Sequence, residues 1–433
     1  MLAPVTDGFD AELFLRLVGE RLVLERAGRR PEPWPAAPLY ETASALVAVG
    51  ALDEPVAEEV LTDYERAMQV RGAHGLVGLH RPPPSGRPSG DLPAARVWAC
   101  DEALELAGGR LHLHCVALRP DGASLLVSFA PAPAPGGGGP PPPFGRPRPM
   151  AGRHPMAALQ QVTVVDDRGT AVTATFSGGG SPATWRGQLQ TGPGQALSTS
   201  TRWLEIGGTR VVLGEPVTPP AVTVEPLGDA GQAERFLWGR LTSGRHGPHG
   251  GPHPPMVEAA VEALVAAGAL AADSPVIEQV ADVMAAFSGQ VPARRLPDPW
   301  QSLVRSLPRQ GSRSFLVPLG VVTPPLSGPK VAVDAVFAQD GVLEAQVRVT
   351  GPGPWGQRFG RVGQAVSWWA EDDLGNHYLG SPGNGGGGPE GWQGTIGFWP
   401  SLDDRASALT LAPTGADARA LIRFDLPAKE PGR

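Results

Sequence analysis

The chain has 433 residues, enough for two to four domains of roughly 100–200 residues each. Its 58 glycines and 49 prolines make up about a quarter of the sequence, which excludes a protein built mainly of long helices. The formal net charge is −7 and there is no basic block, so the electrostatic footprint of nucleic-acid binding is absent.

The N-terminal residues lack the cationic and apolar segments of a signal peptide, and no stretch reaches the ~18 apolar residues of a membrane span. Two cysteines, Cys100 and Cys115, are too few for a disulfide framework. We therefore expect a cytoplasmic protein with reduced thiols and no membrane association. Both cysteines fall on neighbouring strands of one predicted hairpin, and the sequence leaves open whether they pair.

Five groups of residues recur once, in the same order, with a period of roughly 220 residues. The closest match joins residues 45–52 to residues 263–270. The other matches are 12–15 with 234–237, 53–56 with 273–276, 121–122 with 340–341, and 166–169 plus 185–187 with 372–375 plus 392–394. Two unrelated domains of the same biased composition would give scattered matches. The collinear order therefore predicts an internal duplication.

Each copy is predicted to begin with a three-helix part, at 1–72 and at 229–289. Apolar residues recur at helical spacing there, Gly50 is a plausible helix end, and Asp53 is a plausible N-cap. The expected helices, in chain order, are 11–26, 39–49 and 53–68, then 230–241, 256–267 and 273–287.

Short strands separated by glycine and Asx turns follow the helices in each copy. The expected strands are 96–106, 110–118, 124–129, 158–166, 171–177, 184–190, 201–206 and 210–213, then 314–321, 331–338, 342–350, 364–371, 376–379, 391–398, 408–411 and 419–425. Their number and spacing predict an α+β protein in which an immunoglobulin-like antiparallel β-sandwich, at 95–225 and at 312–427, follows each helical part. The Pro- and Gly-rich residues 130–155 are predicted to form a long loop in the first sandwich.

Sequence signatures of enzymes are missing. Neither Lys330 nor Lys429 follows a glycine, which excludes a phosphate-binding P-loop, and common hydrolase and zinc motifs are absent. Residues 351–356 match G-x-G-x-x-G, but they contain two prolines and precede a strand, so we interpret them as a loop. We expect no cofactor, and we favour a non-enzymatic protein.

Histidines provide weak candidates for metal ligands. His246, His249 and His253 have ligand-like spacing, although a solvated linker without a nearby carboxylate is the simpler interpretation. His112 and His114 alternate onto one face of a strand, which predicts that Cys115 faces the other way and that these neighbours do not form a three-ligand site.

Paired acids occur at the same place in both copies, Asp166-Asp167 and Asp372-Asp373, each followed closely by a glycine. Two adjacent carboxylates supply too few oxygens for calcium, whereas Asp and Gly are what a β-turn requires. We therefore expect these acids to form turns.

Tryptophans provide the candidates for a binding surface. Trp368 and Trp369 are adjacent on a predicted strand, so they must point to opposite faces, and one of them is expected to be outward-facing or covered by the loop at 383–391. Trp399 is the third candidate. Trp185 and Trp392 occupy equivalent strands and are expected to be core residues.

The preferred functional hypothesis is a non-enzymatic protein-binding or scaffold protein whose partner is another protein. The helical parts at 1–72 and 229–289 carry net charges of −6 and −4, against +3 for the rest, so they suit a basic partner or packing within the chain. The alternative is an enzyme or a carbohydrate-binding protein with a site in the cleft between the two units. A transcriptional regulator is disfavoured because residues 273–287 contain no arginine. The oligomeric state stays open.

Overall fold

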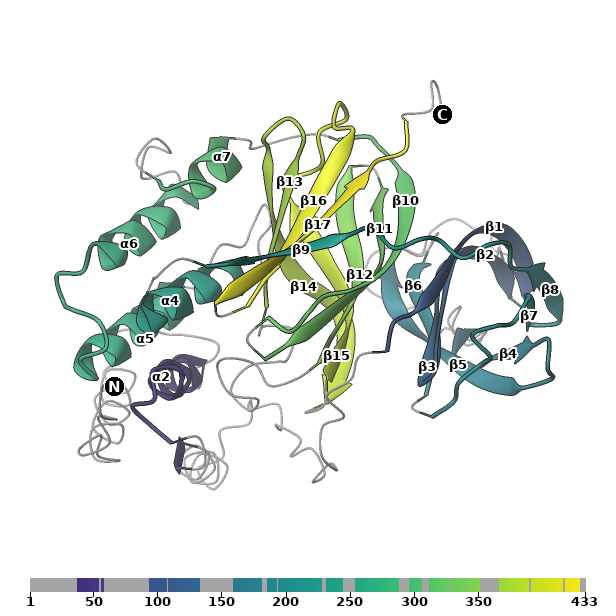
Figure 1. Cartoon of the computed structure of the whole chain (residues 1–433), viewed down its shortest axis with the longest axis horizontal. Helices are drawn as coiled ribbons and strands as arrows, with labels where there is room; N and C mark the ends of the chain where they lie inside the picture. Colours follow the sequence, from purple (N-terminus) through teal and green to yellow (C-terminus); the bar gives the residue numbers. More distant parts are fainter. Residues whose placement is uncertain are drawn as a thin grey trace, which may run out of the picture.

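The structure is a computed structural model. It describes residues 37–53, 56–57, 93–106, 108–132, 159–180, 185–192, 194–227, 231–243, 254–287, 296–305, 311–326, 328–339, 341–350, 366–388, 391–415 and 417–428. Strands make up 49% of these residues, in two barrel-like sheets, and five short helices accompany them. The helices, the second sheet and the first sheet follow one another along the long axis of the molecule (Figure 1).

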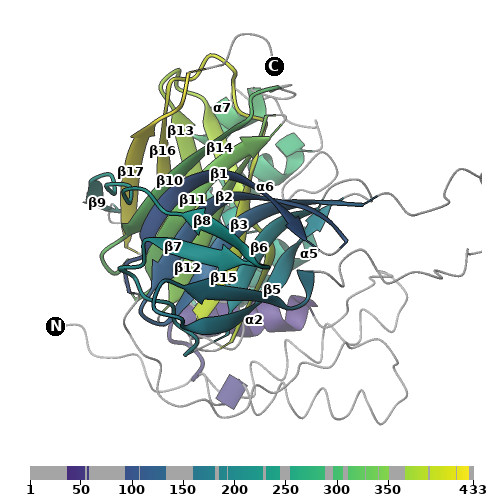
Figure 2. The same ribbon diagram turned by 90° about the vertical axis from the view of Figure 1, so that its right-hand side faces the viewer.

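Sheet A is the barrel-like sheet of the first copy, and it has eight antiparallel strands in the order β1-β2-β3-β6-β5-β4-β7-β8. Its strands are β1 (Arg96–Leu106), β2 (Gly109–Arg119), β3 (Gly122–Pro131), β4 (Val162–Asp166), β5 (Ala171–Gly180), β6 (Trp185–Thr191), β7 (Trp203–Ile206) and β8 (Thr209–Val212). Figure 2 looks onto this sheet, with the other sheet behind it. Its interior is apolar and includes Trp98, Leu113 and Phe129.

Sheet B has nine strands in the order β10-β11-β12-β15-β14-β13-β16-β17-β9. They are β9 (Val222–Pro226), β10 (Phe315–Val322), β11 (Lys330–Gln339), β12 (Val342–Thr350), β13 (Ser367–Asp372), β14 (His377–Gly388), β15 (Gly391–Trp399), β16 (Ala408–Thr414) and β17 (Ala418–Asp425). Its interior includes Trp368, Tyr378 and Ile396. Apart from β9, its strand order repeats that of sheet A, strand for strand.

Equivalent residues also occupy equivalent places in the two sheets, as the predicted duplication requires. Val127 pairs with Gly187 across β3 and β6, and Val347 pairs with Gly394 across β12 and β15. A register shift lies between Leu113 and Cys115 in β2, and its counterpart in β11 lies between Val333 and Ala335. The halves therefore share both their topology and their irregularities.

The prediction of two three-helix parts, each with its own immunoglobulin-like sandwich, is wrong. A sandwich divides its strands between two packed sheets, whereas here the pairings of β3 with β6 and β4 with β7 join all strands of a copy into one sheet. Evenly spaced short strands are typical of both sandwiches and barrels, so their spacing alone did not distinguish the two. These long-range pairings decide the architecture.

The helices form one shared layer against sheet B rather than one part for each sheet. They are α2 (Ala37–Ala48), α4 (Gln232–Ser243), α5 (Pro254–Ala266), α6 (Pro275–Phe287) and α7 (Trp300–Arg305). Helix α2, from the first copy, packs on the helices of the second copy through a common core that includes Leu46, Phe236 and Leu264 (Figure 1).

Within the described ranges, no helix is both long and apolar enough to cross a membrane. The helix expected at 11–26 and most of the one at 53–68 lie outside the described residues.

The segment between the two sheets takes part in both of them. The Val217 amide donates a hydrogen bond to the Val97 carbonyl of β1 (2.8 Å), and the Trp98 indole donates one to the Gly214 carbonyl (3.1 Å). A few residues later the same segment becomes β9, which pairs with β17. The connection between the halves is therefore hydrogen-bonded along much of its length.

Candidate functional site

The space between the two sheets, where the alternative hypothesis placed a site, contains an apolar contact. Val97 and Cys115 of sheet A form one buried cluster with Ala335 of sheet B, and Leu316 and Phe337 pack against it. These residues lie on the outer faces of β1, β2, β10 and β11. Equivalent strands of the two copies thus pack on each other.

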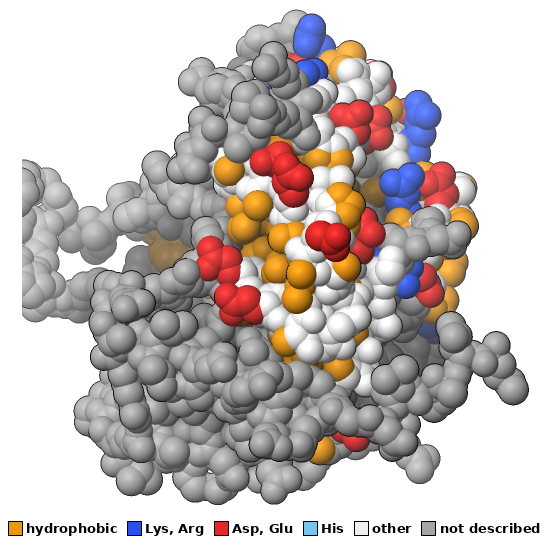
Figure 3. All heavy atoms as spheres, turned by 90° about the vertical axis from the view of Figure 1, so that its left-hand side faces the viewer, with side chains coloured by type: hydrophobic (Ala, Val, Ile, Leu, Met, Phe, Trp, Pro, Cys, Tyr) orange, Lys and Arg blue, Asp and Glu red, His pale blue; other side chains and the backbone are white. Residues whose placement is uncertain are grey.

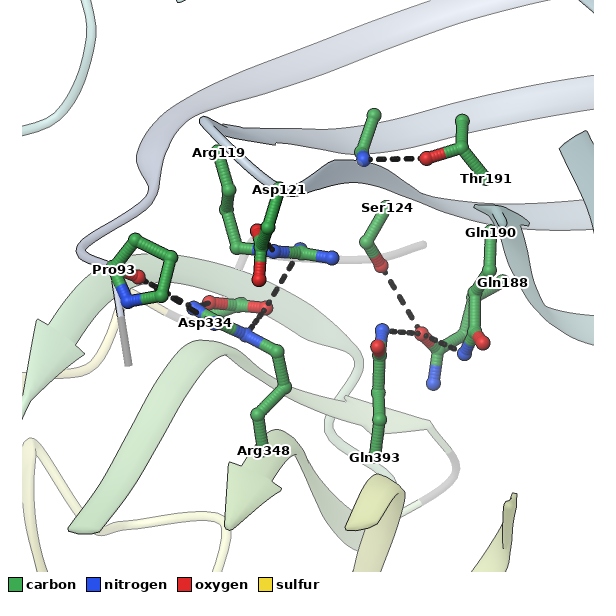
Figure 4. Close-up of polar contacts among 11 residues, drawn as sticks. Pro93, Arg119, Asp121, Ser124, Gln188, Gln190, Thr191, Asp334, Arg348 and Gln393 are labelled. Carbon is green, nitrogen blue, oxygen red and sulfur yellow. Dashed lines mark hydrogen bonds and ion pairs between the residues drawn. The ribbon is translucent and has the colours of Figure 1, made fainter. Parts of the chain in front are cut away.

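A buried ion-pair cluster lies beside this apolar contact (Figure 4). The Arg348 guanidinium donates to both carboxylate oxygens of Asp334 at 3.2 and 3.0 Å, and Arg119 lies 3.8 Å from the same carboxylate. All three residues are buried. Burial acts to raise the pKa of Asp334, but the charges of Arg348 and Arg119 outweigh it and hold that pKa below its usual value. Asp334 therefore stays ionised and joins the two sheets.

Glutamines extend the polar contact between the sheets. The Gln188 side-chain carbonyl accepts hydrogen bonds from Ser124 (3.1 Å), Gln190 (2.8 Å) and, across the interface, Gln393 (3.3 Å) (Figure 4). These groups bond to one another, so the interface has the character of a structural contact.

A β-bulge changes the expected arrangement of His112, His114 and Cys115. Before the register shift Leu111 and Leu113 face the core of sheet A, but after it Val116 and Leu118 do. The shift therefore turns Cys115 to the outer face that also carries both histidines, and the prediction that Cys115 faces the other way is wrong. The histidine rings lie 4.6 Å apart. His114 contacts the Ser128 hydroxyl at 2.9 Å, and burial, followed by the charge of His112, lowers its pKa to about 4.

The two thiols are unpaired and have the character of structural cysteines. Cys115 lies in the contact between the sheets, whereas Cys100 packs against the core of sheet A. Burial raises the pKa of Cys100 to about 11 and raises that of Cys115 well above its usual value. Reactive cysteines require a lowered pKa, so neither thiol is suited to act as a nucleophile.

The paired acids form turns in both copies, as predicted. The Asp166 carboxylate accepts hydrogen bonds from the amides of Arg168, Thr170 and Ser198 at 2.8–3.0 Å. Its counterpart Asp372 accepts from the amides of residues 374 and 376 and from a tyrosine hydroxyl, at 2.6–3.0 Å. These carboxylate oxygens are engaged in local hydrogen bonds, which argues against calcium.

Metal ligands do not gather in the part of the chain that the structure describes: no group of three or more His, Cys, Asp or Glu residues is arranged to hold an ion. The three weak candidates, His246, His249 and His253, lie outside the described residues.

The three tryptophan candidates have different surroundings. Trp368 is only 1% exposed inside sheet B, so Trp369 is the outward member of the adjacent pair. Trp369 is half-buried, and Trp300 of α7 packs on it edge-to-face with ring centres 5.1 Å apart. Trp399 is half-buried against Phe287 of α6, with ring centres 6.0 Å apart. Trp369 and Trp399 thus take part in the contact between the helices and sheet B.

An open groove of about 1090 Å³ lies on the outer face of sheet B, beside the start of α7. Its floor follows β16 and includes Thr410, Ala412 and Thr414. Trp369 is the one tryptophan candidate that lines this groove.

Opposite charges lie on the two sides of this groove. Thr410 pairs with Glu371 on β13 and with Arg423 on β17, so a carboxylate and a guanidinium flank the same floor residue. Asp298, just before α7, lines the groove on the Glu371 side. His377 is 3.9 Å from the Glu371 carboxylate.

No motif in the sequence indicates the groove. The sequence feature that could have indicated it is the alternation of exposed and buried residues in β17. The outward side chains there are Arg419, Leu421 and Arg423, and the buried ones between them are Ala420 and Ile422. That alternation identifies a half-exposed strand, but only the pairing of β17 with β16, and of β16 with β13, places the arginines opposite Glu371.

No model of a known protein family matches this chain, and no curated protein matches it. One solved structure, described as the crystal structure of the conserved domain protein from Bacillus anthracis, is similar over 73% of this chain and 77% of that chain. The sequence identity is 9% and the TM-score is 0.17, which is too low to assign a fold or a function to this chain.

Proposed function

We propose that this chain is a non-enzymatic protein-binding protein that docks a basic partner on the consecutive helices α5 and α6. The observation that carries the proposal is the charge around α6: residues 273–287 contain three acidic residues and neither lysine nor arginine. We also propose a cytoplasmic location, because two unpaired thiols suit a reducing compartment.

Acidic and apolar side chains lie together on this side of the molecule. Asp273 and Glu278 are exposed, Asp282 is half-buried, and Ile277 and Ala281 provide apolar surface between them. Figure 3 looks at the side of the molecule that carries the helices, and red carboxylates there are set among orange hydrophobic side chains. A surface of this kind suits a partner that presents cations around an apolar centre.

The spacing of the acids on α6 supports the same conclusion. Glu278 and Asp282 are four residues apart, so they share one side of the helix, where two like charges destabilise it by about 0.2–0.5 kcal/mol. Cations from a partner would offset this cost. The alternative, an enzyme or a carbohydrate-binding protein with a site in the cleft between the units, is not the one we propose, because the described residues there form the apolar contact and the ion-pair cluster.

Charge reversal on α6 tests the proposal. Immobilised wild-type protein is expected to retain a basic protein from native cell extract, and the purified partner should bind the double variant Glu278→Lys/Asp282→Lys at least about tenfold more weakly, equivalent to ~1.4 kcal/mol. The control Glu215→Lys/Asp425→Lys makes the same change in net charge at two exposed sites, one in the segment that joins the sheets and one in β17, and should bind like the wild type. Equal binding by both variants, or recovery of no partner, would contradict the proposal.

A further inference from the structure

The groove on sheet B is a second candidate binding site, separate from the proposed docking surface on the helices. Its volume of about 1090 Å³ is slightly above the range of roughly 300–1,000 Å³ typical of small-molecule pockets. It is open to solvent and runs beside strands β13, β16 and β17. These dimensions suit a ligand that is longer than a single metabolite.

The two walls of the groove carry opposite charges. On one side lie the carboxylates of Asp298 and Glu371, and the Glu371 side chain is 57% exposed. On the other side lie Arg423, which is exposed, and Arg419, whose charge is partly offset by Glu225 at 2.8 Å. Glu371 and Arg423 are each one strand away from Thr410, which separates their backbones by about 10 Å at the usual strand spacing.

The floor between the walls offers hydrogen-bonding groups to a polypeptide backbone. Thr410 and Thr414 alternate with Ala412 along β16, so two hydroxyls line the groove on either side of a small residue. The Thr414 hydroxyl donates its proton to the Ala412 carbonyl at 2.9 Å, and its oxygen can still accept a hydrogen bond. Residues on one side of a strand repeat about every 6.6 Å, which is also the repeat of alternate residues in an extended ligand.

We propose that this groove binds an extended polypeptide segment in which basic and acidic side chains alternate. Side chains of an extended chain point alternately to opposite sides. With its backbone over the threonine hydroxyls, such a segment directs its basic side chains to Asp298 and Glu371 and its acidic ones to Arg423. A segment of uniform charge would face repulsion from one wall.

Two peptides of equal composition test the pattern. We would use a fluorescent octapeptide that alternates lysine and glutamate, and a second octapeptide with four lysines followed by four glutamates, both with blocked termini. Fluorescence anisotropy at low salt is expected to show at least about tenfold tighter binding of the alternating peptide to the full chain, because only that peptide matches both walls. Equal affinity for the two peptides, or no binding of the alternating one at millimolar concentration, would overturn the proposal.

Charge reversals in the walls make the test specific to the groove. Glu371→Arg and Arg423→Glu should each weaken binding of the alternating peptide at least about fivefold, since each places charges of the same sign on the two sides of Thr410. The double variant Glu371→Arg/Arg423→Glu should restore part of the binding, because opposite charges again flank Thr410 and the peptide can meet them after a shift of one residue. Unchanged melting temperatures establish that the variants are folded. Failure of the double variant to restore binding, or single variants that bind like the wild type, would count against the groove.

Discussion

At the scale of single residues, one carboxylate organises a turn in each copy. Asp166 accepts hydrogen bonds from three backbone amides, and Asp372 has the corresponding position in sheet B. The glycines that follow, Gly169 and Gly375, have φ angles of 81° and 76°, a conformation that other residues rarely adopt. The chain therefore needs both the acid and the glycine to reverse direction at this point.

Replacing Asp166 by asparagine is expected to lower the free energy of unfolding at pH 7 by about 2–3 kcal/mol, because hydrogen bonds to a charged acceptor are lost. The amide hydrogen bonds hold the pKa of Asp166 below its ordinary value despite burial. Its contribution is therefore fully present above the unfolded pKa of about 4 and is lost as the pH falls through the lower pKa of the folded state. Urea unfolding of Asp166→Asn and wild type should show a difference that shrinks below pH 4. The exposed Asp425→Asn serves as the control, and a pH-independent difference would refute the explanation.

At the scale of secondary-structure elements, helix α2 is tied to the helices of the second copy by a buried ion pair. The Glu41 carboxylate, which is 1% exposed, accepts two hydrogen bonds from the Arg240 guanidinium of α4. The arginine also lies over the ring of Phe236. Among the described residues, Arg240 is the cation that pairs with the buried Glu41 carboxylate.

Removal of either partner alone should be costly. Arg240→Met leaves the Glu41 carboxylate buried without its arginine and is expected to destabilise the helical layer by about 3–5 kcal/mol. The double variant Glu41→Leu/Arg240→Met should recover most of that loss, since no charge then stays buried. Far-ultraviolet circular dichroism during thermal unfolding measures both effects. Additive losses in the double variant would show that the ion pair is not the cause.

Sequence patterns predicted the elements better than their assembly. The helices expected at 256–267 and 273–287 coincide closely with α5 and α6, and glycine turns delimit most strands where expected. The single sheet in each copy was not predictable, because the pairing of β3 with β6 depends on contacts between residues such as Phe129 and Trp185, which are far apart in the sequence. Strict alternation also failed at His114, where one inserted residue reverses the faces of the strand.

At the scale of the whole molecule, Asp334 joins the two halves. It contacts Arg348 within its own sheet and Arg119 of the other sheet, and both arginines are buried. His114 and Ser128 occupy the equivalent positions in sheet A, where a neutral contact replaces the ion pair. The interface is therefore built from equivalent strands but has acquired different chemistry on its two sides.

Asp334→Ala should weaken the coupling between the sheets, because two buried guanidinium groups lose their shared carboxylate. We expect a loss of about 3–5 kcal/mol and the division of one cooperative calorimetric transition into two. Asp121→Ala is the matched control, since its carboxylate also contacts Arg119, at 3.3 Å, but is 58% exposed, and its loss should cost under about 1 kcal/mol. A single transition at an unchanged melting temperature in Asp334→Ala would refute this role.

The segment that joins the sheets has a mechanical consequence. Residues 214 and 217 bond to β1 of sheet A, and residues 222–226 are the last strand of sheet B, so hydrogen bonds attach the segment to both sheets. Tension between the halves would act on the hydrogen bonds between β9 and β17. Leu227, at the end of this segment, lines the groove, and its amide donates a hydrogen bond to the Asp417 carbonyl at 2.7 Å. A force that separates sheet A from sheet B would therefore be transmitted through this segment to the wall of the groove on sheet B.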